Sequence, residues 1–294
     1  HDFGFRGTSS SESAVIGAAA HLLSFKGTDT LAAIPFTHKY YGATTTPGFS
    51  IPASEHSTIT SWGKENEVKA FENMLDQYPT GPVACVSDSY DITEATDLLW
   101  PSLKDKILSR DGVLVIRPDS GDIKMTLQVV LSNLWKHFGG HLTDDGYKVL
   151  HPKVRVIQGD GMNYESLKET LSYIQTIGFS TENVAFGMGG ALLQKVDRDT
   201  QKFAFKCSAI KVSGEWKPVQ KAPTELDEHG DKHASFKKSK GGRLALSKAI
   251  NTGQYATISL MGDAIYNEDE LKTVFEDGRQ VGPKAEWDKV RRRA

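Results

Sequence analysis

Residues 112–138 read GVLVIRPDSGDIKMTLQVVLSNLWKHF and combine three patterns that decide the fold class. The first five residues are apolar and do not alternate with polar ones, which is typical of a strand buried on both faces. Residues 117–122 are polar and rich in turn formers. In residues 125–138 the apolar positions follow helical spacing, namely Leu127, Val130, Leu131 and Leu134. The stretch therefore predicts one strand, one turn and one amphipathic helix.

The same order of patterns occurs on both sides of this stretch. Short β-rich runs lie at 82–86 (PVACV), 154–157 (VRVI) and 184–186 (VAF), and a second helical pattern occupies 166–177. Alternation of apolar strands with helices predicts a parallel sheet covered by helices. Outside this core we expect helices over 9–25 and 65–75, strands over 203–212 and 254–261, and a lysine-rich loop over 217–243.

Composition narrows the class of protein. The chain has 294 residues, of which 38% are hydrophobic, and its formal net charge is -2. A sizeable core is therefore available, and the lack of a basic excess argues against a nucleic-acid binder. No apolar run approaches the roughly 20 residues that span a bilayer, so we expect no membrane partner. Cys85 and Cys207 lie in apolar contexts, which predicts buried thiols in a cytoplasmic protein.

Polar, turn-forming residues follow all four expected strands. The endings are SDSYD (87–91), RPDSGD (117–122), QGDGM (158–162) and GMGG (187–190). The carboxyl ends of parallel strands meet at one edge of the sheet, where α/β enzymes build their active sites. Asp and Gly also make ordinary turns, but their recurrence at four endings favours a functional site.

Three charged residues at these endings have definite chemical uses. Asp119 and Asp160 offer carboxylates that would accept hydrogen bonds from sugar hydroxyls, hold Mg²⁺ or stabilise a developing cation. Arg117 adds a positive charge to one of the same endings. A helix cap is the alternative interpretation for each aspartate.

Two further motifs indicate phosphate chemistry. Gly189 and Gly190 let backbone N–H groups approach an anion, and Arg198 downstream adds a bidentate contact; a close helix–strand contact is the alternative. His56 lies among polar residues, which favours a general acid or base or a phosphoryl acceptor over a packed core histidine. A surface histidine is the alternative. No second histidine lies at metal-ligand spacing, so we discount a metal-ligand role for His56 and assign no metal-binding residue.

Seven motifs in this order resemble those of the nicotinamide phosphoribosyltransferases, which have the type II phosphoribosyltransferase fold. The motifs are HDFGFRG (1–7), FKGTDT (25–30), PASEHST (52–58), SDSYD, IRPDSG, VIQGDG and AFGMGGALLQK. The resemblance runs from residue 1 to about residue 243. It implies an irregular parallel α/β barrel that carries the catalytic site over residues 1–200, and part of a second α+β lobe over residues 201–294.

The resemblance also implies an activity and a role for each matching residue. The family transfers the phosphoribosyl group of phosphoribosyl pyrophosphate to nicotinamide, giving nicotinamide mononucleotide and pyrophosphate in NAD salvage. The catalytic candidates are Asp29, facing the carboxamide, Asp119, on the ribose, and His56, phosphorylated by ATP. The other matches are Phe3 on the pyridine ring, Arg6 and Arg117 in the base and ribose region, Gly159 and Asp160 in the ribose-phosphate loop, and Gly189, Gly190 and Arg198 around the 5′-phosphate.

Cofactors and partners follow from the same resemblance. Mg²⁺ is expected with the diphosphate, and ATP as a coupled substrate. We expect a homodimer with a shared active site, in which the partner adds a second aromatic side chain to the pyridine ring. The family has a large segment upstream of the first motif, so we interpret this chain as a fragment. The upstream part would complete the second lobe, on the same polypeptide or as a separate chain of the same protein.

Two other functions stay open. One is a nicotinate or quinolinate phosphoribosyltransferase of the same fold, and the other is a non-catalytic relative. Asp29 favours nicotinamide, because a carboxylate that faces nicotinate meets a like charge. The presence of His56, Asp119 and Arg198 beside it argues against lost catalysis. Met188 departs from the family pattern, since a small residue would fit the glycine loop better.

Overall fold

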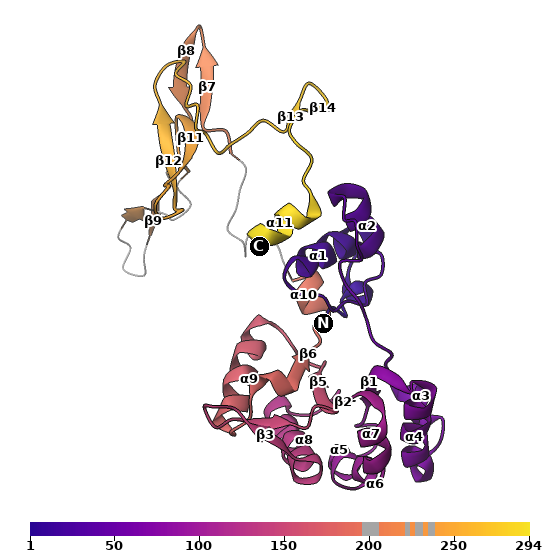
Figure 1. The fold of residues 1–294 in the computed structure, drawn as a ribbon. Helices are drawn as coiled ribbons and strands as arrows, with labels where there is room; N and C mark the ends of the chain where they lie inside the picture. The colour runs from indigo at the N-terminus through magenta and orange to yellow at the C-terminus, as the bar shows by residue number, and fades with distance from the viewer. Residues whose placement is uncertain (196–205, 221–223, 227–231, 235–238) are drawn as a thin grey trace. The chain divides into compact units, whose positions relative to one another are not determined.

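The computed structural model describes residues 1–195, 206–220, 224–226, 232–234 and 239–294. The chain divides into two units (Figure 1), of which the first comprises His1–Asp197 with Ala285–Ala294 and the second Arg198–Lys284. The expected catalytic and second-lobe domains stay a prediction, but the last residues of the chain belong to the first unit. No helix within the described ranges is long and apolar enough to cross a membrane.

The first unit is built on a four-stranded parallel sheet with the strand order β1-β2-β5-β6. The pairing is parallel throughout, with Val83 opposite Leu114 and Val156 opposite Val184. All four apolar runs of the sequence fall in these strands, so the predicted parallel α/β arrangement is confirmed. The strands are β1 (Thr80–Val86), β2 (Asp111–Arg117), β5 (Val154–Gln158) and β6 (Val184–Phe186).

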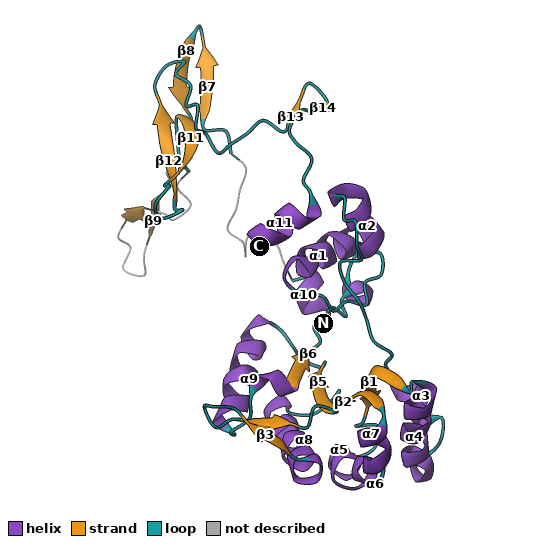
Figure 2. Cartoon of the chain, viewed as in Figure 1, coloured by secondary structure: helices purple, strands orange, loops and turns teal. Residues whose placement is uncertain are grey.

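Helices cover one face of this sheet (Figure 2). Leu114 and Ile116 of β2 point into the core that these helices form, in which the rings of Phe71 and Trp100 stack with centroids 4.2 Å apart. The covering helices and turns are α4 (Glu67–Gln77), α5 (Ile92–Glu94), η3 (Ala95–Leu99), α6 (Trp100–Ser102), α7 (Lys104–Ser109), α8 (Ile123–Phe138) and α9 (Tyr164–Thr176). A short hairpin of β3 (Gly140–Leu142) and β4 (Lys148–Leu150) follows α8.

Local sequence explains where the long helices begin. The side chain of Asp122, the last residue of the RPDSGD ending, accepts a hydrogen bond from Met125 N at 2.9 Å and so caps α8. Asn163 caps α9 in the same way through Ser166 N at 3.0 Å. Both helices lie within two residues of the ranges that the apolar spacing predicts.

The second face of the sheet carries a separate, smaller apolar cluster. Because successive strand residues point to opposite faces, Ala84, Val115 and Ile157 turn away from the helices. Phe3 and Ile51, from the N-terminal part of the chain, pack against them. The apolar strands are therefore buried on both faces, as their lack of alternation predicts.

Extended N-terminal segments run beside the two edges of the sheet. Single parallel bridges join Met188, just beyond β6, to Asp2, and Ala53 to Ala84 of β1. Asp2 is fully buried, and Thr28 Oγ1 donates a hydrogen bond to its carboxylate at 2.8 Å. These contacts hold residues 1–3 and 27–29 side by side next to the end of β6.

A second core lies among another group of helices of the first unit. Ala18, Leu22 and Trp287 are buried together in it, and Trp287 meets the ring of Tyr41 edge-on. This contact explains why the C-terminal residues belong to the first unit. The helices and turns around this core are η1 (Phe5–Gly7), α1 (Ser11–Ser24), α2 (Ala33–Tyr41), α10 (Gly190–Leu193) and α11 (Trp287–Arg293). The unit also contains α3 (His56–Thr60), which adds Ile59 to the first core, and the short turns η2 (Lys64–Asn66) and η4 (Thr181–Asn183).

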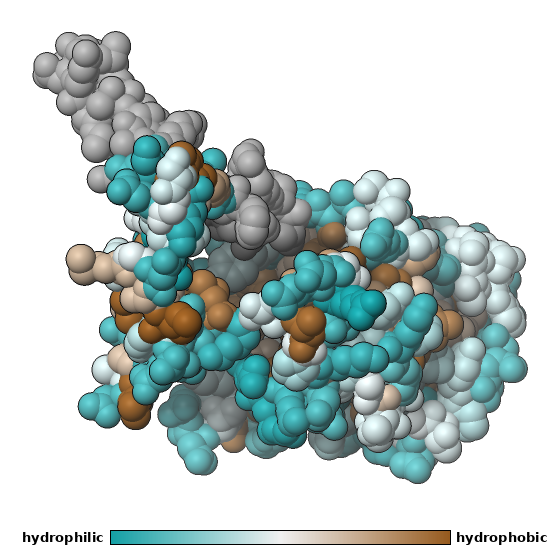
Figure 3. All heavy atoms as spheres, turned by 90° about the horizontal axis from the view of Figure 1, so that it is seen from above, coloured by the Kyte–Doolittle hydropathy of each residue, from teal (hydrophilic) through white to brown (hydrophobic). Residues whose placement is uncertain are grey.

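The second unit consists of β-hairpins with little core of their own. Among its described residues Ala245 is the one buried apolar residue, whereas Met261 and Phe275 are exposed. Hydrophobic residues are interspersed among hydrophilic ones on the face of the molecule in Figure 3. The strands are β7 (Ala209–Val212), β8 (Glu215–Pro218), β9 (Thr224–Leu226), β10 (Lys232–Ala234), β11 (Arg243–Lys248), β12 (Tyr255–Leu260), β13 (Phe275–Glu276) and β14 (Arg279–Gln280).

Two expectations for this part of the chain need correction. Strands β9 and β10 lie within residues 217–243, the stretch expected to be a loop, and the last two residues of β8 also fall in it. Cys207 is exposed rather than buried, since β7 begins only at Ala209 in a hairpin that has no core around it. Cys85, in β1, is buried as expected, and burial raises the pKa of its thiol to about 12.

Candidate active site

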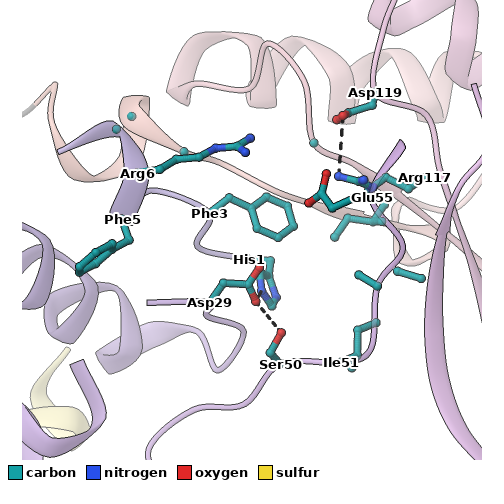
Figure 4. A pocket seen from close by; sticks show the side chains of 17 residues that line it. His1, Phe3, Phe5, Arg6, Asp29, Ser50, Ile51, Glu55, Arg117 and Asp119 are labelled. Carbon is teal, nitrogen blue, oxygen red and sulfur yellow. Dashed lines mark hydrogen bonds and ion pairs between the residues drawn. The ribbon is translucent and has the colours of Figure 1, made fainter. Parts of the chain in front are cut away.

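A cavity of about 470 Å³ lies over the second face of the sheet (Figure 4). We call it the strand-end cavity. His1, Phe3 and Asp29 stand on one side of it, and Arg117 and Asp119 stand on the other. Its lining consists of His1, Phe3, Phe5, Arg6, Gly7, Asp29, Ser50, Ile51, Ala53, Glu55, Ala84, Arg117, Asp119, Ile157, Gly159, Gly189 and Gly190.

Asp29 belongs to the N-terminal wall, where two neighbours hold its carboxylate. His1 Nε2 lies 2.7 Å from Asp29 Oδ1, and Ser50 Oγ donates a hydrogen bond to the same oxygen at 2.5 Å. Burial by itself raises the pKa of Asp29, but the hydrogen bonds from His1 and Ser50 and the charges of His1 and Arg117 bring it below its ordinary value. The carboxylate is therefore ionised at neutral pH.

Phe3 points its ring into the cavity from the same wall. Its N–H donates to Met188 O at 3.0 Å, and its ring centroid lies 4.7 Å from that of His1. A Cβ on Gly187 would come within 2.0 Å of Phe3 Cε2, so only glycine fits beside the ring. At Gly187, then, glycine serves a close packing contact.

Arg117 and Asp119 form the opposite wall at the end of β2. Arg117 Nη1 lies 3.7 Å from Asp119 Oδ2, and Arg117 Nη2 donates to a backbone carbonyl at 2.9 Å. Burial raises the pKa of the Asp119 carboxyl; Arg117 opposes the shift, whereas the negative charges of Asp88 and Asp160 add to it. The wall thus pairs a largely buried cation with a carboxyl that gains a proton more readily than an exposed aspartate.

His56 is the first residue of α3 and lies next to this wall. Its Nε2 is 3.1 Å from Asp88 Oδ1, and its Nδ1 is 3.9 Å from Asp119 Oδ2. Asp88 in turn accepts hydrogen bonds through Oδ2 from Asp119 N at 3.0 Å and from Ser120 Oγ at 2.5 Å. Asp88 therefore orients the imidazole and ties it to the end of β2.

Gly189 and Gly190 form the edge of the cavity beyond β6. A Cβ on Gly189 would lie 3.6 Å from its nearest neighbour, and one on Gly190 would lie 4.0 Å away, so packing within the protein does not require glycine at either position. Their missing side chains leave backbone open to the cavity. Arg198, which the sequence analysis placed with them, lies outside the described residues.

The structure brings most of the sequence-predicted residues to one place. Those that line the cavity are Phe3, Arg6, Asp29, Arg117, Asp119, Gly159, Gly189 and Gly190. His56 stands just behind the lining, and Asp160 is exposed but close enough to affect the pKa of Asp119. Within the part of the chain that the structure describes, no group of three or more His, Cys, Asp or Glu side chains could hold a metal ion.

Three residues of the site were not predicted from the sequence. His1 precedes Phe3 by two residues, and in an extended segment this spacing turns both side chains to the same side, a signal that was available. Asp88 lies in the SDSYD ending, where nothing in the pattern distinguishes it from its neighbours. Ser50 has no sequence signal, because its contact with Asp29 arises only from the folded path of the chain.

Comparison with known proteins identifies the class to which this fold and cavity belong. The model of the nicotinate phosphoribosyltransferase (NAPRTase) family matches residues 1–279, and the chain belongs to this family. It is similar to the nicotinamide phosphoribosyltransferase of Xanthomonas campestris pv. campestris, with 50% identity over 293 residues, which are 98% of this chain and 60% of the relative. The nicotinamide phosphoribosyltransferase of Mycoplasma pneumoniae is 37% identical over 236 residues, covering 76% of this chain and 50% of the relative.

A third relative also matches most of this chain but only part of its own length. The nicotinamide phosphoribosyltransferase of Acinetobacter baylyi is 33% identical over 313 residues, covering 100% of this chain and 60% of the relative. The chain thus spans 50–60% of the length of these curated relatives. A solved structure from Saccharomyces cerevisiae, described as a nicotinate phosphoribosyltransferase, aligns with a TM-score of 0.37 and 14% identity over 55% of this chain and 35% of its own.

Proposed function

We propose that the protein transfers the phosphoribosyl group of phosphoribosyl pyrophosphate to nicotinamide, giving nicotinamide mononucleotide and pyrophosphate in NAD salvage. The observation that carries this proposal is the ionised carboxylate of Asp29 beside the ring of Phe3 in the strand-end cavity. An uncharged carboxamide offers N–H donors to such a carboxylate. Nicotinate would place a second negative charge against it. The names of the curated relatives support the same substrate.

The rest of the cavity suits the phosphorylated sugar. Asp119 offers acceptor oxygens to ribose hydroxyls at the end of β2, and Arg6 and Arg117 supply positive charge between the two substrates. Open backbone at Gly189 and Gly190 permits an anion to approach N–H groups closely. These features support a 5′-phosphate at the β6 end; Arg198 stays a predicted contact to it from the sequence.

The reaction is a displacement at the anomeric carbon of the ribose. The pyridine nitrogen forms the new C–N bond as the C–O bond to pyrophosphate breaks, and positive charge develops on the sugar ring. Asp119, partly buried next to Arg117, would stabilise that charge. The cavity also holds both substrates in line, which lowers the entropic part of the barrier.

His56 is proposed to couple ATP hydrolysis to this reaction. Its Nε2 is held by Asp88 at 3.1 Å, an arrangement that orients the ring and makes the other nitrogen a better nucleophile. A nitrogen of His56 would take the γ-phosphoryl group as the bond to the departing ADP breaks, and water would later hydrolyse the phosphohistidine. The added negative charge would lie next to Asp119 and bias the position of the β2 ending.

Mg²⁺ is proposed to accompany the diphosphate. When bound, it neutralises charge on the leaving pyrophosphate. Asp119 and Asp160 offer the oxygen ligands that this cation prefers, but the described residues contain no complete set of protein ligands. The residues therefore fit a cation held chiefly by diphosphate oxygens, with one or two carboxylates from the protein.

We also propose that the four-stranded sheet is part of an irregular parallel α/β barrel. Single parallel bridges support this closure, because they join one edge of the sheet to the other through the N-terminal segments. Ala84, Val115 and Ile157 would then face the barrel interior, and the cavity would lie at its carboxyl end. In order around the ring, the bridges are Met188–Asp2, Asp2–Thr28, Gly27–Phe49 and Ala53–Ala84.

The complete protein is proposed to act as a cytoplasmic homodimer with a shared active site. The relatives are longer than this chain, which supports an additional segment that completes the second lobe. The apolar side chains exposed on the second unit are consistent with such a covering segment. Sedimentation of the complete polypeptide tests the dimer, because a monomer that retains full activity would contradict a shared site.

Product analysis tests the proposed function. The complete polypeptide is incubated with phosphoribosyl pyrophosphate and Mg²⁺, together with either nicotinamide or nicotinate, and the mononucleotides are separated by chromatography. We expect nicotinamide mononucleotide as the preferred product. Preferential use of nicotinate would instead indicate a nicotinate phosphoribosyltransferase, and the absence of both products would indicate a non-catalytic relative.

A further inference from the structure

We propose that His1 and Ser50 are positioning residues for substrate selection, holding Oδ1 of Asp29 so that Oδ2 is the oxygen presented to the carboxamide. This inference rests on the proposed function and deepens it. Selection of an uncharged ring substituent would then depend on a set of three side chains rather than on Asp29 alone.

The hydrogen bonds around Asp29 are unevenly distributed between its two oxygens. His1 Nε2 at 2.7 Å and Ser50 Oγ at 2.5 Å both contact Oδ1. No residue within the described ranges donates a hydrogen bond to Oδ2. A carboxylate oxygen has two lone-pair directions, so the two donors occupy Oδ1 and leave Oδ2 as the available acceptor. The side chain of Asp29 is 47% exposed, and it lines the cavity.

The backbone keeps these groups in register. Asp29 N donates to Asp2 O at 2.9 Å, and Asp2 N donates to Gly27 O at 3.0 Å, so the segments that carry His1 and Asp29 are directly paired. The side chain of Asp2 points the opposite way and is fully buried. His1 and Asp29 therefore cannot separate without breaking a buried hydrogen-bond network.

The imidazole of His1 is also packed in place. A Cβ on Gly27 would lie 2.6 Å from His1 Nδ1, so the ring rests against a position where only glycine leaves it room. Its other neighbour is Phe3, with ring centroids 4.7 Å apart. The side chain of His1 is only 15% exposed. One residue thus supports both the proposed ring platform and the carboxylate that selects the substituent.

This arrangement has a specific consequence for the ligand. With Oδ1 occupied, the carboxylate cannot rotate freely, so its remaining acceptor has one direction in the cavity. A carboxamide N–H satisfies that acceptor, whereas a carboxylate supplies no donor and adds a like charge. Without His1 or Ser50 the carboxylate loses orientation and also gains a proton more readily, and a protonated Asp29 could donate a hydrogen bond to nicotinate.

The experiment measures steady-state kinetics of the complete polypeptide with nicotinamide and nicotinate in four variants. His1→Leu removes the donor, His1→Gln keeps an N–H donor at about the reach of the imidazole Nε2, and Ser50→Ala removes the hydroxyl. His141→Leu is the matched control, because His141 is exposed and remote from the cavity lining. For His1→Leu we expect the KM for nicotinamide to rise by about 10-fold or more, with kcat changing less than about 3-fold.

The ratio of kcat/KM for nicotinamide to that for nicotinate should fall in His1→Leu and Ser50→Ala and recover in His1→Gln. If His1 and Ser50 only stabilised the fold, their loss would affect both substrates alike, and a donor in His1→Gln would not restore the ratio. Thermal unfolding identifies a variant that fails to fold, and Ser50→Ala then supplies the test. Unchanged ratios in folded His1→Leu and Ser50→Ala would overturn the proposal.

A second measurement does not depend on turnover. Carbon-13 NMR of labelled aspartate follows the titration of Asp29, and we expect its pKa to rise in His1→Leu relative to the wild type and to return towards it in His1→Gln. A wild type that forms no nicotinamide mononucleotide would refute the proposed function, while this titration still decides whether His1 holds Asp29. An unchanged Asp29 titration would refute the positioning role.

Discussion

Asp29→Asn changes one atom of the cavity wall, and the hydrogen bonds of Asp29 fix the direction of the expected effect. His1 and Ser50 both donate to Oδ1, so the introduced side chain should turn its carbonyl oxygen towards them. Its amide nitrogen would then stand where Oδ2 stands in the wild type. A donor replaces an acceptor at that point, which weakens the contact with a carboxamide and creates one with nicotinate.

The magnitude follows from charge and hydrogen bonding. Two like charges about 4 Å apart repel by roughly 4 kcal/mol at an effective dielectric near 20, and by about 1 kcal/mol in bulk water. Because the Asp29 side chain is 47% exposed, we take an intermediate value of about 2 kcal/mol. Loss of a charge-assisted hydrogen bond to the carboxamide adds about 1.5 kcal/mol. The amide-to-acid ratio should therefore fall by a few hundred-fold, on the order of 10² to 10³.

The assay is competition between nicotinamide and nicotinate at saturating phosphoribosyl pyrophosphate, with the ratio of kcat/KM values as the readout. Asp145→Asn is the matched control, because Asp145 is exposed in the turn between β3 and β4. Its ratio should equal that of the wild type. If Asp29→Asn shifts the ratio by less than about 3-fold, the carboxylate does not select the substrate and the reasoning from its charge fails.

Three further outcomes are expected. His56→Ala should abolish stimulation of product formation by ATP; a variant that keeps the full stimulation would exclude the phosphohistidine. Burial, with Glu94 adding to it, raises the pKa of Glu67 to about 7 from 4.5, so its stabilising contribution is complete below pH 4.5 and is lost as the pH rises through 7. The free energy of unfolding of the wild type, measured by urea denaturation, should therefore fall by up to about 3 kcal/mol between pH 5 and pH 8. Glu67→Gln should remove this pH dependence; an equal pH dependence in the variant and the wild type would contradict the assignment. Gly187→Ala should destabilise the fold by about 1–3 kcal/mol in thermal unfolding because its Cβ meets a ring at 2.0 Å, whereas Gly190→Ala should unfold like the wild type yet raise the KM for phosphoribosyl pyrophosphate; the opposite ranking would refute both glycine assignments.

Sequence patterns predicted the sheet and the polar edge of the cavity for a simple physical reason. A run such as GVLVI specifies a strand locally, and parallel pairing then brings every carboxyl end to one edge. Arg117, Asp119 and Gly159 reach the cavity by this rule alone. The helix that begins at Ile123 was equally accessible, because its apolar spacing and its Asp122 cap are both local signals.

The contacts that complete the site are not local. His1, Asp29 and Ser50 meet because single bridges pair the N-terminal segments, and a single bridge leaves no periodic pattern in the sequence. Cys207 illustrates the opposite error. Its apolar neighbours predicted burial, but a side chain is buried only where another surface packs against it. Among the described residues of its unit, Ala245 is the one apolar residue that is buried.

The position of Trp287 has a consequence for biosynthesis. This side chain is 4% exposed in the same cluster as Ala18 and Leu22, although more than 260 residues separate it from them in the chain. During translation α1 and α2 emerge long before Trp287 does, and part of their apolar surface stays uncovered until it arrives. A chain truncated within the second unit would therefore leave the apolar surface of α1 and α2 without its Trp287 neighbour.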